Sequence, residues 1–167
     1  MAITYEPIIT TTTSTAARSF NFTSIPSTYT DLVLVVNLTT AAATNMRMRF
    51  NSNVATNYST THLNGSGSAA TSTRENTENG GLIDYDAYPN GGSSSISTYI
   101  ININNYSNTT TFKTWLNRAS NAGTGVVATV GLWRQTSAIN AIEIYTSSAT
   151  GTISSGTVFT LYGIKAA

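Results

Sequence analysis

The side chains best suited to chemistry in this sequence are one histidine and two closely spaced aspartates. His62 is the only histidine. A Ser-His-Asp arrangement needs a partnered base, and a metal site usually needs more than one imidazole, so we expect a structural or surface role for His62. Asp84 and Asp86 would lie on one side of an extended segment. Paired carboxylates can bind Ca²⁺ or cleave a glycosidic bond. Ca²⁺ takes six or more oxygens, however, and the chain has only 7 acidic residues.

Two tyrosines, Tyr85 and Tyr88, flank the aspartates. Tyrosines beside a glycine-rich loop can stack on sugars or contact a protein, and they can equally be half-buried rings at one end of a sandwich. We expect Asp84, Tyr85, Asp86 and Tyr88 to form an exposed loop, for which an ordinary polar loop is the favoured interpretation. If the chain binds an ion or a host glycan, this loop is the expected place. We expect no catalytic, cofactor-binding or metal-binding residue.

The composition limits the classes of partner. The chain has 167 residues, a length typical of one domain. Charged residues make up 9% of it against about 25% in an average protein, and the net charge is +1. That balance provides no basic field for nucleic acid or an anionic membrane. Cysteine is absent, which excludes disulfides and thiolate metal sites. Because no apolar run is long enough to span a bilayer and the first residues lack a signal-peptide pattern, we expect a soluble product.

Short apolar runs alternate with Ser, Thr, Asn and Gly, which indicates an all-β protein. We predict an antiparallel β-sandwich, jelly-roll-like, of about eight to ten strands. The expected strands are residues 3–10, 19–22, 31–36, 46–50, 96–103, 112–118, 125–133, 139–145 and 158–164, and residues 58–63 and 82–85 are two further candidates.

Three further expectations concern how these segments lie. Trp115 and Trp133 fall within strong strands, so we expect both in the core. In the strand 125–133, the residues expected on the inner face are Val126, Ala128, Val130 and Leu132. Residues 64–78 are polar and rich in Gly and Ser, which predicts a long exposed loop.

The N-terminal segment differs from the rest of the chain. Pro7 cannot donate a ladder hydrogen bond, so it restricts this segment to a sheet edge or an interface arm. The apolar pair Ile8 and Ile9 follows it. We therefore divide the chain into an arm or edge strand, residues 1–13, and a single sandwich domain, residues 14–167. The expected partner contacts are Tyr5, Pro7, Ile8 and Ile9.

Several segments resemble small virion proteins of tailed phages, especially cyanophages and other marine phages. They are FTSIPSTYTDLVL (22–34), RFN (49–51), NYS (57–59), LNGSG (63–67), INNYSN (103–108), KT (113–114), GLW (131–133), AI (138–139) and FTLYGIK (159–165). They span nearly the whole chain in the family's order. The resemblance implies a structural virion protein with a β-sandwich fold, and it carries over no catalytic residue.

The resemblance and the composition lead to one favoured hypothesis and two alternatives. We expect a capsid decoration (cement) protein, assembled in the host cytoplasm and located in the virion, which binds the major capsid protein as a symmetric homotrimer. The first alternative is a tail or head fibre module, an adhesin that binds a host glycan or receptor. An enzyme such as a polysaccharide depolymerase is disfavoured by the scarcity of acids and the single histidine, so we expect no enzymatic activity.

Overall fold

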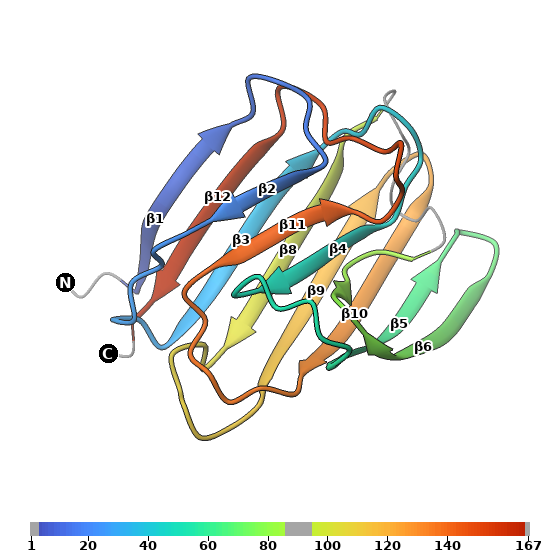
Figure 1. Cartoon of the computed structure of the whole chain (residues 1–167). Coiled ribbons are helices and arrows are strands. Elements are labelled where there is room, and N and C mark those ends of the chain that lie inside the picture. Colours follow the sequence, from blue (N-terminus) through green and yellow to red (C-terminus); the bar gives the residue numbers. More distant parts are fainter. Residues whose placement is uncertain (1–3, 86–94, 166–167) are drawn as a thin grey trace.

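The computed structural model describes residues 4–85 and 95–165. The described residues form twelve strands and no helix. These strands make two antiparallel sheets, one of eight strands and one of four, that lie face to face (Figure 1). The all-β antiparallel sandwich predicted from the sequence is confirmed. The strand count exceeds the expected eight to ten because the candidate segments at 58–63 and 82–85 both contribute to strands and the polar segment before residue 79 also forms one.

Each sheet is described by its strands in spatial order. The eight-stranded sheet consists of β1 (Tyr5–Thr12), β12 (Val158–Ile164), β3 (Asp31–Leu38), β8 (Ser97–Asn104), β9 (Lys113–Asn121), β10 (Gly125–Trp133), β5 (Tyr58–Gly65) and β6 (Ala70–Glu78). The four-stranded sheet consists of β2 (Ser19–Phe22), β11 (Ile142–Thr146), β4 (Met46–Phe50) and β7 (Gly81–Leu82).

Two hairpins, β5–β6 and β9–β10, account for the unequal size of the sheets. Without them the larger sheet has the order β1-β12-β3-β8 and the smaller one β2-β11-β4-β7. Late strands then lie between early ones in both sheets, as β12 does between β1 and β3. This nested order favours the jelly-roll class, which stays a prediction. The hairpins carry the larger sheet beyond the area that the smaller one covers (Figure 1).

The expected exposed loop at residues 64–78 is wrong for most of its length. Its second part is β6, which pairs with β5 and forms one edge of the eight-stranded sheet. Most β6 side chains are exposed on both faces, so the sequence shows no apolar alternation there. Arg47 of β4 fastens this strand to the smaller sheet through ion pairs with Glu75, at 3.2 Å, and Glu78, at 3.3 Å.

The expected inner face of β10 is also wrong, because the strand presents its other face to the core. Val127 and Trp133 are buried, whereas Val126 is 55% and Val130 58% exposed. A strand can bury only every second residue against one layer. Trp133 has a larger apolar surface than any other side chain of β10, so the face of the strand that carries Trp133 turns inward.

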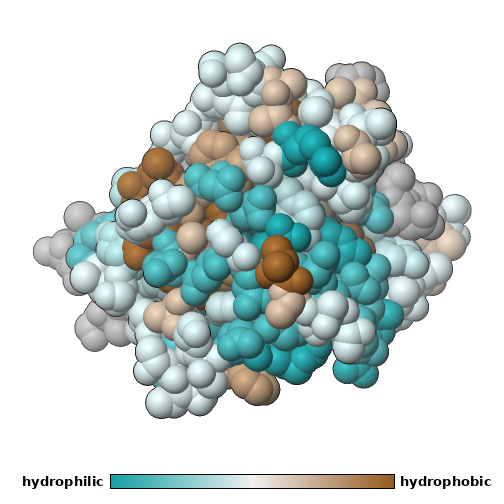
Figure 2. Space-filling model, in the orientation of Figure 1, coloured by the Kyte–Doolittle hydropathy of each residue, from teal (hydrophilic) through white to brown (hydrophobic). Residues whose placement is uncertain are grey.

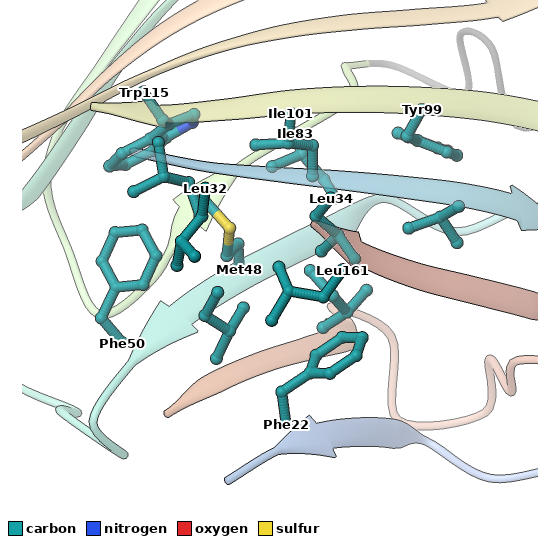
Figure 3. Close-up of a cluster of buried hydrophobic side chains, with 14 of the residues drawn as sticks. Phe22, Leu32, Leu34, Met48, Phe50, Ile83, Tyr99, Ile101, Trp115 and Leu161 are labelled. Atoms are coloured by element: carbon teal, nitrogen blue, oxygen red, sulfur yellow. The ribbon is translucent and has the colours of Figure 1, made fainter. Parts of the chain in front are cut away.

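The core lies between the two sheets. Figure 3 shows side chains from the larger sheet, such as Leu34 and Ile101, above those of the smaller sheet, such as Met48 and Phe22. All four are buried. In β4, Met46, Met48 and Phe50 point inward, while Arg47 and Arg49 are half-buried on the outer face. The expected core positions of Trp115 and Trp133 are confirmed, since each is 1% exposed.

Trp115 packs directly on the backbone of two glycines. A Cβ atom built on Gly131 of β10 or on Gly81 of β7 would lie closer than 3.0 Å to the indole ring. Gly131 pairs with Trp115 across the β9–β10 ladder, and Gly81 belongs to the opposite sheet. The indole therefore contacts both layers at the place where the smaller sheet ends.

We predict that Gly131→Ala destabilises the protein by about 1–3 kcal/mol, because the added methyl group must displace a fully packed indole. The change is measured as a lower urea midpoint at an unchanged slope. Gly123→Ala is the matched control, since its Cβ would have ordinary contact with Asn121 at 3.4 Å. Equal midpoints for the two variants would contradict this account of Trp115.

Candidate functional site

The predicted N-terminal contact residues lie on an edge strand. β1 pairs with β12 and has no neighbour on its other side among the described strands. Its register shifts between Pro7 and Ile9, a β-bulge beside the proline. Tyr5, Pro7 and Ile9 are exposed, and the Tyr5 ring lies edge-on to Tyr162, with centroids 6.4 Å apart. Ile8 differs from these three, because it packs against the core.

The expectation that Asp84 lies in an exposed loop is wrong. Its carboxylate is fully buried and accepts two hydrogen bonds of 2.7 Å, one from the backbone N–H of Met46 and one from the hydroxyl of Tyr99. The short strand β7 leads the chain into the sandwich just before this residue. Buried polar groups need partners, and Asp84 has them within the fold. Asp86 and Tyr88 lie outside the described residues.

The two rings of Tyr85 and His62 are stacked, with centroids 5.4 Å apart and an interplanar angle of 21°. His62 is fully buried on β5. Its Nδ1 lies 3.0 Å from the hydroxyl of Thr129 and its Nε2 lies 2.9 Å from that of Thr60. Both ring nitrogens are therefore occupied by threonine hydroxyls. Of the structural and surface roles that the sequence left open, the structural one applies.

Burial shifts the pKa values of these two ionisable groups in opposite directions. It raises the pKa of Asp84 to about 7, although the hydrogen bonds from Tyr99 and Met46 favour the charged form. Burial, together with the positive charge of Arg47, lowers the pKa of His62 to about 4. Both shifts favour the neutral form of the side chain in the folded protein.

One feature that the sequence did not lead us to expect is an apolar surface on the outside of the eight-stranded sheet. We call it the outer patch. Its most exposed side chains are Leu63 (60%), Leu116 (43%), Val126 (55%) and Val130 (58%). Half-buried apolar neighbours on the same face are Ile100, Ala128 and Leu132. In the strand register Leu63 lies beside Ala128, and Leu116 beside Val130. The patch lies mainly on the strands that the two hairpins add to the larger sheet.

A signal for this patch was present in the sequence of β10. Residues 126–133 are apolar at almost every position, rather than at every second one. Continuous apolar runs are typical of strands covered on both faces. The opposite side of the molecule, shown in Figure 2, is mainly hydrophilic over the four-stranded sheet. There Arg49 pairs with Glu143 at 2.9 Å and lies over the ring of Tyr145.

The outer patch contains an open hollow of about 370 Å³. It lies over β8, β9 and β10, and its outward lining includes Ile100, Val126, Ala128 and the side chain of Arg118. Leu116 and Val130 stand on the same two strands, just beyond the hollow. Projecting apolar side chains and an apolar hollow therefore lie side by side on one face of the sheet.

The described residues hold no group of three or more acidic or histidine side chains placed to share a metal ion. In residues 4–85 and 95–165 there is also no helix able to cross a membrane. Comparison with protein-family models, curated proteins and solved structures finds no match to this chain. The resemblance to phage virion proteins accordingly rests on the sequence segments alone.

We predict that Asp84→Asn changes how stability depends on pH. In the wild type the raised pKa of Asp84 contributes stability that is fully present below about pH 4 and is lost as the pH rises through about 7. An asparagine at this position does not titrate. The variant therefore gains stability relative to the wild type across this range, by ~1.4 kcal/mol for each unit by which the aspartate pKa is raised.

The measurement is the difference in free energy of unfolding between wild type and Asp84→Asn at pH 4.5 and pH 8. His62 has the opposite dependence, because its lowered pKa makes acid destabilising between about pH 6.5 and 4. Its contribution is common to both proteins and cancels in the difference. A difference that stays constant with pH would show that Asp84 is not buried as described.

Proposed function

We propose that this protein is a structural component of a phage virion without enzymatic activity. More specifically, it is a capsid decoration protein that binds the outer surface of the major capsid shell and stabilises it. The observation that carries the proposal is the apolar surface exposed at the β1 edge of the eight-stranded sheet, where Tyr5 is 55% and Ile9 42% exposed. Contiguous exposed apolar surface on a soluble domain marks sites of protein–protein contact.

A second line of support is the set of phage-like segments, which runs through the chain in order. Two titratable residues whose pKa values are shifted by burial, Asp84 and His62, also fit a non-catalytic role. Asp84 and His62 are buried, and the polar atoms of both are engaged with neighbouring side chains or backbone. Neither presents a reactive atom to a substrate in this arrangement, whereas a catalytic acid or base must reach the proton that it transfers.

We assign the capsid contact to the exposed edge of β1. Tyr5, Pro7 and Ile9 project from a strand whose bulge and proline discourage pairing with another strand. Their side chains remain available for packing into a pocket on a partner. Ile8 is not part of this contact, because it packs into the core.

The fibre or adhesin alternative has less support in the described residues. A glycan site needs an accessible ring and accessible polar groups, but Asp84 is buried and Tyr85 stacks on His62. The two hypotheses predict different abundances in the particle. Quantitative mass spectrometry of purified virions should find a decoration protein in numbers comparable with the major capsid protein, and a fibre protein in only a few copies.

We predict that Tyr5→Ser combined with Ile9→Ser lowers capsid occupancy at least about tenfold. Burying one large apolar side chain contributes about 1.5–3 kcal/mol, and ~1.4 kcal/mol is a tenfold change in affinity. Purified protein is mixed with shells of the encoding phage that lack it, and bound copies are counted by mass spectrometry. Substitutions are preferable to deleting residues 2–13, because β1 pairs with β12 along most of its length.

The control is Val54→Ser, which changes a side chain 67% exposed in the segment between β4 and β5. Circular dichroism checks that all variants are folded. Unchanged occupancy of the double variant would contradict the contact at β1, and the absence of wild-type binding to the shells would contradict the decoration function itself.

A further inference from the structure

We propose that a second copy of this chain packs on the outer patch, so that the eight-stranded sheets of two copies lie face to face. This two-fold contact forms between isolated chains, does not depend on the virion assignment, and makes a dimer where the sequence led us to expect a homotrimer. It also uses a different surface from the proposed capsid contact, because β1 and the patch strands β10 and β5 lie in opposite halves of the sheet (Figure 1). One chain can therefore use both contacts at once.

The size of the face suits a stable contact between two copies. The six strands from β3 to β6, among which the patch strands are central, lie about 4.8 Å apart and are about 26 Å long, so they make a face on the order of 750 Å² and leave β1 and β12 outside it. A stable interface of standard size buries about 800 Å² on each partner. The outer patch supplies the apolar centre of such an area, since its exposed side chains come from β5, β9 and β10.

The shape of the patch favours a copy of the same chain as the partner. Sheets that pack face to face keep their strand directions within about 30°, the angle arising from the twist of each, and two identical sheets share one twist. In a two-fold contact the same surface must both offer and receive side chains. The outer patch does both: Leu116 and Val130 project beside the hollow that Ile100 and Ala128 line. The projecting pair of each copy can therefore enter the hollow of the other.

Charge on the face is compatible with this arrangement. Arg118, which lies across from Ala128 and Ile100 in the register, is the charged residue that lines the hollow. An arginine can lay its aliphatic stem along apolar surface and keep its guanidinium in water at the rim. Two copies can thus approach without burying the charge of Arg118. One positive charge on this face also provides little attraction for an acidic partner.

The edges of the sheet are less suited to self-association than its face. β1 carries Pro7 and a bulge next to it, both of which obstruct pairing with another strand. At the other edge, β6 holds charged side chains, among them Arg74 and the ion-paired Glu75. We therefore expect a second copy to pack on the face of the sheet and not to pair with either edge strand.

The test is sedimentation equilibrium of the wild type, of Val130→Asp and of the matched control Val54→Asp. We expect the wild type and the control to be oligomeric and Val130→Asp to dissociate at least about a hundredfold more readily, because the new carboxylate would be buried without a partner. Both valines are more than half exposed in the single chain, so neither change should prevent folding. A monomeric wild type, or an unchanged association of Val130→Asp, overturns the proposal.

A second measurement applies even if Val130→Asp fails to fold. The chain has no cysteine, so a single introduced thiol reports on its own surroundings. Leu116→Cys should react with a maleimide slowly in concentrated solution and faster on dilution, whereas Val54→Cys should react at one rate throughout. Equal rates for the two thiols in concentrated protein overturn the proposal.

Discussion

The structure depends on a mismatch between its layers: a sheet of four strands cannot cover the inner face of a sheet of eight. Trp115 packs where the small sheet ends on the large one. Its indole lies against Gly131 in its own sheet and against Gly81 in the other, so the end of the small sheet is fixed on the large one. Close packing of this kind leaves no room for a side chain at either glycine.

Beyond Trp115, the inner face is filled by aromatic rings, by neutral polar groups and by Lys113, whose Nζ donates to the backbone carbonyls of Thr111 and Thr136. Tyr58 and Trp133 stack at 6.1 Å, and His62 is satisfied by two threonine hydroxyls and covered by Tyr85. A charge-poor sequence can bury such groups because hydroxyl and amide partners satisfy them at lower desolvation cost than ions. One charged group joins the two layers, since Arg47 of β4 pairs with Glu75 and Glu78 of β6.

The same mismatch shapes the outside of the molecule. The strands added by the hairpins extend the large sheet, and the outer side of that extension is apolar, whereas the visible face of the small sheet is mainly hydrophilic (Figure 2). One sandwich therefore has two chemically different faces. This asymmetry, together with the protected β1 edge, is the basis for assigning separate surfaces to a capsid partner and to a second copy.

The sequence by itself determined the fold class, most strand positions and the burial of both tryptophans, because alternation and β-branched composition are local signals. Only the tertiary structure decided what those strands face. It turned Val126 and Val130 outward, placed β6 in a polar segment without periodicity, and buried Asp84 against Tyr99. Such outcomes depend on which layer covers a residue. Contacts between strands distant in the chain determine this coverage, and neighbouring residues do not.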